Sequence, residues 1–175
     1  MGRLLQRYFD ICLLRAGPQD LPSSGFLLWL SGLGYFAAGM LMSLQNLDVA
    51  RATLLVGQDI ALLAGLLFAL LWSRDMLVRY RQTLTALLGT GAILQIVALP
   101  ILSWQQAGLA EDTISSALMF ASLLLWIWLL WDLMVIGHIL RHTLSTRLPI
   151  GVLLALVYLF VSYSVTRILF FPETN

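Results

Sequence analysis

The sequence predicts an all-α fold: a polytopic membrane helical bundle of five transmembrane helices with an N-terminal interfacial amphipathic helix. Composition is the first observation, since 60% of the 175 residues are hydrophobic and 11% are charged, with a mean hydropathy of +0.90. Soluble domains are far more polar. Second, apolar segments of about 20 residues, the length of one bilayer crossing, recur five times. Third, the connections are short, so they leave no room for a soluble domain between the spans.

We expect residues 1–24 to form a cytoplasmic interfacial segment. A helix is predicted at its start, because apolar side chains fall on one helical stripe and charged ones on the other. The apolar stripe contains Leu4, Leu5, Tyr8, Phe9 and Cys12, and the charged stripe contains Arg3, Arg7 and Asp10. Pro18 and Pro22 break this helix, and Ser23 or Ser24 can cap the first span. The alternative is a solvated tail with local helicity.

The transmembrane domain, 25–171, is predicted to cross the membrane at residues 25–44, 52–72, 83–103, 114–140 and 149–171. Eight arginines lie before the first span and in the second and fourth loops, whereas the loops of the other side hold only Arg51. The positive-inside rule therefore predicts a cytoplasmic N-terminus and an external tail, 172–175. The third loop agrees, with Glu111, Asp112 and no basic residue. All ten basic residues are arginine, which indicates a GC-rich bacterial genome and hence an inner membrane.

Small residues recur every four positions in the second span. They are Gly57, Ala61, Gly65 and Ala69. Helices in lipid associate through close backbone packing rather than through apolar burial, and small residues allow that approach. We interpret the stripe as packing within the chain, with a dimer face as the alternative.

Three polar residues are expected in the outer half of the membrane: Asp59, Gln95 and Arg167. An Asp59–Arg167 pair, with Gln58 or Gln95 completing the hydrogen bonds, would satisfy both charges. One alternative is a polar outer vestibule, and the other is an arginine that snorkels to the interface.

Asp132 lies in the apolar run WLLWDLMVIGHIL, and we place it in the inner half. A charge near the bilayer centre costs at least about 2.5 kcal/mol. One interpretation is structural, with hydrogen bonds to Thr83, Thr85 or tyrosines of neighbouring spans, or a pair with Arg74. A second is a proton or cation relay that reaches His138 through water, because His138 falls on another helical face. The others are a counter-charge from a partner helix, and catalysis.

Chemistry finds little support in the sequence. Neither H-E-x-x-H nor G-x-S-x-G occurs, so the metal and serine-nucleophile templates are absent. We expect Asp59 and Asp132 to lie in opposite halves, too far apart for an acid–base pair. Two histidines and one cysteine cannot form a structural zinc site, and His138 and His142 share one face, which disfavours haem. We therefore predict a protein that is not an enzyme, with no catalytic residue, cofactor or metal, and the net charge of +1 gives no sign of nucleic-acid binding.

The layout resembles that of the Yip1 family of small membrane proteins. The shared features are a cytoplasmic N-terminal segment, the proline-bearing stretch LLRAGPQDLPSSGFLL, five closely spaced spans and a short tail. The resemblance implies a role in membrane organisation or trafficking through partner proteins, and it carries over no catalytic residue. This sequence departs from the family pattern because its N-terminal segment is short.

Our leading hypothesis is a non-enzymatic inner-membrane protein that organises membranes or assembles complexes through helix–helix contacts. Its partners would be the lipid bilayer and either another membrane protein or further copies of itself. The alternative is a small proton-coupled transporter or channel that uses Asp132 and His138, as an oligomer because five spans suit no inverted repeat.

Overall fold

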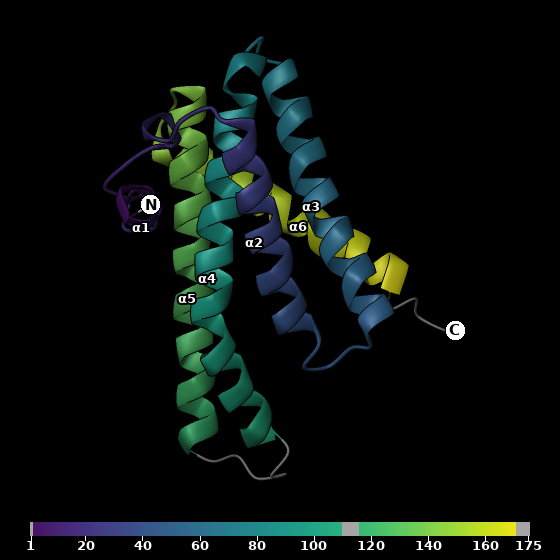
Figure 1. Ribbon diagram of the computed structural model, residues 1–175. Helices are drawn as coiled ribbons and strands as arrows, with labels where there is room; N and C mark the ends of the chain where they lie inside the picture. The colour runs from purple at the N-terminus through teal and green to yellow at the C-terminus, as the bar shows by residue number, and fades with distance from the viewer. Residues whose placement is uncertain (1, 110–115, 171–175) are drawn as a thin grey trace.

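The computed structural model describes residues 2–109 and 116–170, and this part of the chain is helical with short connections. Its elements are α1 (Gly2–Cys12), η1 (Pro18–Asp20), α2 (Gly25–Ser43), α3 (Val49–Trp72), η2 (Leu77–Arg79), α4 (Tyr80–Leu109), α5 (Ser116–Leu144) and α6 (Leu148–Phe170) (Figure 1). Five helices, α2 to α6, are long and apolar enough to cross a membrane. The predicted all-α fold and its five helices of spanning length and composition are thereby confirmed. The expected acidic loop with Glu111 and Asp112 and the expected tail, 172–175, lie outside the described residues.

Helix α4 lies between α2 and α5 in the tightly packed part of the bundle. Its first half is enclosed so completely that residues 83–90 are all buried. Helix α6 packs against α5 and α3, and in Figure 1 it runs obliquely behind the other helices, from the top of α5 to the lower half of α3. Because of this oblique path, α6 contacts both α5 and α3.

Helices α5 and α6 meet backbone to backbone at two glycines. A Cβ atom built on Gly151 would lie 2.2 Å from the carbonyl oxygen of Gly137, which is less than any real contact. Larger residues would therefore separate the two helices.

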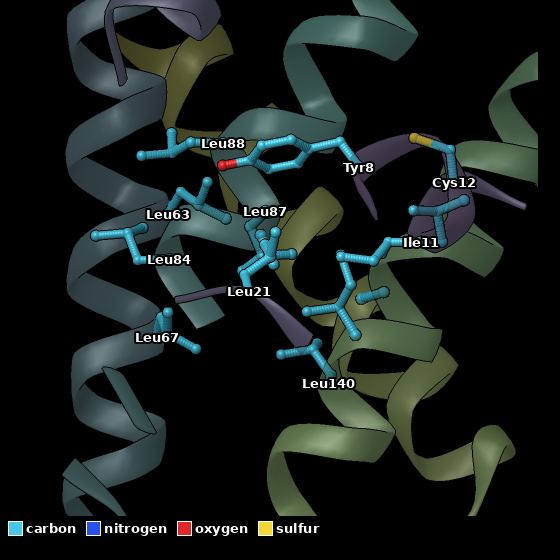
Figure 2. Close-up of a cluster of buried hydrophobic side chains, with 14 of the residues drawn as sticks. Tyr8, Ile11, Cys12, Leu21, Leu63, Leu67, Leu84, Leu87, Leu88 and Leu140 are labelled. Atoms are coloured by element: carbon cyan, nitrogen blue, oxygen red, sulfur yellow. The ribbon is translucent and has the colours of Figure 1, made fainter. Parts of the chain in front are cut away.

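Helix α1 forms where the sequence predicts it, and part of its apolar stripe packs on protein, whereas Leu5 and Phe9 are exposed. Tyr8, Ile11 and Cys12 are buried, and the Tyr8 hydroxyl lies 2.7 Å from Ser31 Oγ of α2. The Tyr8 ring covers Gly89 of α4, where an added Cβ would lie 2.1 Å from the ring. In Figure 2 Tyr8 reaches from α1 to the side of Leu88. The N-terminal helix is therefore part of the folded core.

The predicted break between α1 and α2 is present. Pro18 begins η1, and Ser24 is the N-cap of α2, with its hydroxyl accepting from the N–H of Leu27. Leu21 of this connection is buried between Leu87 and Leu140 (Figure 2). The linker is thus anchored on both α4 and α5.

The connections that follow α3 and α5 meet at one end of the bundle. Arg79 joins them, since its Nη1 donates to Thr143 O at 2.5 Å and to Ser145 Oγ at 3.1 Å. We call this the arginine-rich end, after Arg74, Arg79, Arg81, Arg141 and Arg147. That it faces the cytoplasm stays a prediction from the positive-inside rule.

Candidate functional site

Asp59 is held near the middle of α3 by three hydroxyl groups from other helices. Its carboxylate accepts hydrogen bonds from Tyr35 of α2 at 2.6 Å, from Tyr158 of α6 at 2.8 Å and from Ser162 of α6 at 3.0 Å. An ionised carboxylate is an acceptor only, with room for about four donors. These three donors therefore supply most of what an anionic Asp59 needs, and they tie α3 to α2 and α6.

Asp132 of α5 shares a cavity with Asp59. The cavity has a volume of about 190 Å³ and is lined by residues from α2, α3, α4, α5 and α6. The two carboxyl groups are close enough for the charge of one to act on the other. A polar space of this size has room for several water molecules. We call it the two-aspartate cavity, and its polar lining consists of Tyr35, Asp59, Thr90, Gln95, Trp128, Asp132, Tyr158 and Ser162.

The expectation that the two aspartates lie in opposite halves of the membrane is wrong. Helix α5 runs on to Leu144, four residues beyond the predicted end of this span at residue 140. Asp132 is thus roughly 18 Å from Leu144 at 1.5 Å per residue, near the middle of a 29-residue helix. Asp59 is also near the middle of its own helix, so the two carboxyl groups meet at one level.

The hydrogen bonds expected for Asp132 are not present. Thr83 Oγ1 donates to Arg79 O at 2.9 Å, and Thr85 Oγ1 donates to Arg81 O at 2.7 Å. The two tyrosines that line the cavity donate to Asp59 instead. Across residues 2–109 and 116–170, the Asp132 carboxyl has no hydrogen bond from another side chain or from the backbone.

The expected Asp59–Arg167 pair is replaced by the hydroxyl groups. Arg167 is exposed near the end of α6, more than a turn beyond Ser162. Gln58 does not complete the carboxylate shell either, because its Nε2 donates to Thr166 Oγ1 at 2.9 Å. Gln95 does line the cavity, and its buried Oε1 has no partner in the described part of the chain.

His138 lies outside the two-aspartate cavity. Its Nε2 is 2.9 Å from Ala16 O in the linker between α1 and α2, and its side chain is buried. A carbonyl oxygen can only accept, so the ring N–H donates this bond. His138 therefore fastens the linker to α5, and of the five candidate polar residues the cavity gathers Asp59, Gln95 and Asp132.

The charge in the cavity is not balanced by the residues around it. Among the described residues that line it, two are aspartates and none is an arginine or a histidine. Two carboxylates in a low-dielectric site repel each other and cannot both stay charged without compensation. Nor do three or more His, Cys, Asp or Glu side chains gather anywhere in the described part of the chain to hold a metal ion. A proton is the simplest compensation that this lining permits.

Cys12 lies near enough to the cavity to respond to it. Burial, and then the charge of Asp132, raise the pKa of the Cys12 thiol to about 11. The backbone is close as well, since Trp131 Nε1 donates to Cys12 O at 3.1 Å. Helix α1 therefore docks beside the segment of α5 that carries Asp132.

The small-residue stripe of α3 does not pack within the chain. Its four members, Gly57, Ala61, Gly65 and Ala69, are all exposed. No atom lies within 4 Å of a Cβ built on Gly57 or on Gly65. The interpretation of the stripe as packing within the chain is wrong.

The sequence contained one unused signal for the cavity. Tyr158 and Ser162 are four residues apart, so they share a face of α6, and both donate to Asp59 Oδ1. Polar side chains at this spacing within an apolar span favour a polar contact with another helix. Ser31 and Tyr35 of α2 have the same spacing, but they contact different helices: Ser31 Oγ lies 2.7 Å from the Tyr8 hydroxyl of α1, whereas Tyr35 donates to Asp59 of α3.

No family model, curated protein or solved structure matches this chain. The resemblance to the Yip1 family stays a prediction from layout.

Proposed function

We propose that this multi-pass membrane protein is a small proton-coupled transporter or channel, with the two-aspartate cavity as its proton-binding site. The observation that carries the proposal is that Asp59 and Asp132 line one cavity without a basic residue among the described lining. Ionisable residues inside spans are costly and commonly mark proton or ion pathways. A proton that enters the cavity relieves the repulsion between the two carboxyl groups.

The two carboxyl groups have different roles in this proposal. Asp59 accepts three hydroxyl hydrogen bonds, which stabilise its anionic form. Asp132 has no such donor in the described part of the chain, so it is the group that gains and loses the proton. Environments that separate two neighbouring carboxyls in this way are typical of proton-transfer sites. Water in the cavity carries the proton to and from Asp132.

Infrared difference spectroscopy tests proton binding without knowledge of a transported molecule. The protein in lipid is taken through a pH titration while the carbonyl stretch of protonated carboxyl groups is recorded. We expect one buried carboxyl band that titrates and is lost in Asp132→Asn. Proton flux into proteoliposomes, followed with an entrapped pH dye, should fall at least tenfold in the same variant.

Asp48→Asn is the matched control, because Asp48 is an exposed aspartate at the N-cap of α3 and pairs with Arg51 on the surface. It should leave the carboxyl band and the flux unchanged. A wild-type protein without a titrating buried carboxyl, or an unchanged band in Asp132→Asn, would contradict the proposal.

A membrane-organising or assembly role is the second candidate, and the exposed stripe on α3 favours it. Close helix packing is the known use of such stripes, and this one has no neighbour within the described part of the chain. Gly57→Leu with Gly65→Leu should then reduce the stoichiometry of a complex captured from native membranes. An unchanged complex in that double variant would count against the stripe as its contact.

A further inference from the structure

A second polar cavity lies at the arginine-rich end, outside the proposed proton site. It has a volume of about 220 Å³ and is formed where the linker, the first turn of α4 and the last turn of α5 meet. We call it the arginine pocket. Its polar side chains are Gln19, Arg79, Gln82, Thr83, His142, Thr143 and Ser145. No aspartate or glutamate is among the described residues that line it, so its charge is opposite to that of the two-aspartate cavity.

Hydrogen bonds fix the walls of the arginine pocket. Arg79 is held by Thr143 O and Ser145 Oγ, and these bonds involve Nη1 alone. Gln82 Nε2 donates to the linker at Gln19 O, 3.2 Å away, and also to Leu21 O. Further N–H groups of Arg79 remain for a ligand, because a guanidinium carries five. The guanidinium of Arg79 is thus held in a fixed position at the pocket by its hydrogen bonds.

The tautomer of His142 adds a second donor. Its Nε2 is 3.3 Å from Arg141 Nη2. An arginine can only donate, so His142 Nε2 accepts and the ring proton of the neutral form sits on Nδ1. Within the described residues Nδ1 has no hydrogen-bond partner. His142 therefore offers an N–H, and it does so whether the ring is neutral or protonated.

Asp20, an acidic residue near the pocket, has its carboxylate bound to the backbone. Asp20 is close enough to His142 for its charge to act there, but its Oδ2 accepts from Gly17 N–H at 2.8 Å. The C-terminal carbonyls of α5 are the other source of negative potential at this end, and Arg79 already binds one of them. Arg141 lies beside His142, so positive charge predominates around the pocket.

The position of the pocket decides which anion it meets. Val78, next to Arg79, is 96% exposed, and Leu77 is exposed as well. Apolar side chains on the surface beside a cluster of arginines are typical of the membrane interface, where lipid phosphates lie. Basic pockets between transmembrane helices at that level bind anionic headgroups.

We propose that the arginine pocket binds the phosphate of an anionic lipid headgroup, with Arg79 and His142 as its donors. A lipid bound there links α4, α5 and the linker that anchors α1. Inorganic phosphate offers the same chemistry from solution, so the test has to separate the two sources.

Native mass spectrometry of delipidated protein measures the binding. Phosphatidylglycerol is the anionic probe, phosphatidylcholine the zwitterionic comparison, and inorganic phosphate the competitor. Ser145→Asp is the decisive variant, because Asp tolerates the positive φ of 52° at this position and can accept from Arg79 in place of the serine. It should cancel the charge of Arg79 and weaken phosphatidylglycerol binding roughly ten- to hundredfold, the range for a charged hydrogen bond.

Arg74→Gln is the matched control, because Arg74 is exposed in the same connection and does not line the pocket. It should retain phosphatidylglycerol binding. Equal binding of the two lipids, or wild-type binding in Ser145→Asp, would overturn the proposal. If millimolar inorganic phosphate displaced phosphatidylglycerol, the proposal of a lipid ligand would be wrong, and the pocket would be a site for free phosphate. Each result is independent of proton uptake at Asp132.

Discussion

The two polar cavities of this protein differ in the sign of their charge, although helices α4 and α5 contribute to both. Asp132 of α5 faces the two-aspartate cavity, which has no basic residue in its described lining. His142, ten residues further along the same helix, faces the arginine pocket, which has no acidic one. The first lies among five helices near their middles, and the second lies at their ends.

This difference shows how depth determines what a charged side chain can do. At the end of the bundle Arg79 finds a carbonyl oxygen and a hydroxyl, so its charge is stabilised by neighbours. In the middle of the bundle Asp132 finds no donor in the described part of the chain, and only a proton or another cation can compensate it. Helices α4 and α5 line both cavities. Some substitutions should therefore affect both cavities, and others only one of them.

Separation of α5 from α6 should have the largest effect, because both cavities depend on α5. Gly151→Leu places a side chain where Gly137 O already lies 2.2 Å from a Cβ position. Overpacking of this kind commonly costs up to about 3 kcal/mol, and here the obstacle is backbone, which cannot move aside. We expect a strong loss of folded protein in detergent, measured by size-exclusion chromatography with fluorescence detection. Gly57→Leu is the control, and equal yields would refute the backbone contact.

Removal of the two carboxyl groups should separate their roles. Asp59→Leu leaves three hydroxyl groups without their acceptor, at about 1–3 kcal/mol for each that stays buried and unpaired. Asp132→Leu removes a carboxyl that has no hydrogen bond in the described residues, so it should cost little or even stabilise the protein. Thermal unfolding in one detergent measures both. A larger loss of thermal stability in Asp132→Leu than in Asp59→Leu would mean that Asp132, and not Asp59, is the carboxyl group that holds the helices together.

The docking of α1 should control the reactivity of Cys12. Its pKa of about 11 lies above the ordinary 9.0, so at pH 8 the reactive thiolate is about a hundredfold scarcer than in a free thiol. Gly89→Ala forces the Tyr8 ring away and should raise the rate of iodoacetamide alkylation, up to that factor.

Linkage gives the sign of the pH dependence. The pKa of the Cys12 thiol is about 11 when α1 is docked and about 9.0 when the thiol is free. Docking of α1 is therefore most stable below pH 9, where the thiol is protonated in both states, and it becomes less stable as the pH rises from 9 to 11. The alkylation rates of wild type and Gly89→Ala should therefore converge over this interval. Identical rates at pH 8 would contradict burial of Cys12 by docking, and Gly57→Ala is the control substitution.

The fold was predictable because one physical requirement, a crossing of about 20 apolar residues, repeats along the chain. The site was only partly predictable. Asp59, Gln95 and Asp132 are recognisable as polar residues within apolar spans, but their depths depend on where helices end, and α5 ends four residues beyond the expected 140. Which face of α3 turns inward was not predictable either, since the small-residue stripe suggested the face that is exposed. Hydroxyl donors can replace an arginine as partners of Asp59, and composition does not distinguish them.

Substitution of Gln95 should change the stability of the protein least. It tests whether proton binding in the two-aspartate cavity requires any polar residue besides the two aspartates. The Oε1 atom of Gln95 is buried without a partner in the described part of the chain, so Gln95→Leu removes an unpaired polar atom rather than a hydrogen bond. We expect a change in unfolding free energy within about 1 kcal/mol, in either direction, because the lost polarity and the lost contacts offset each other. The buried carboxyl band should persist in infrared titrations, since Asp132 remains. A large destabilisation together with loss of that band would mean that water bound to Gln95 organises the cavity, and that the two aspartates do not act alone.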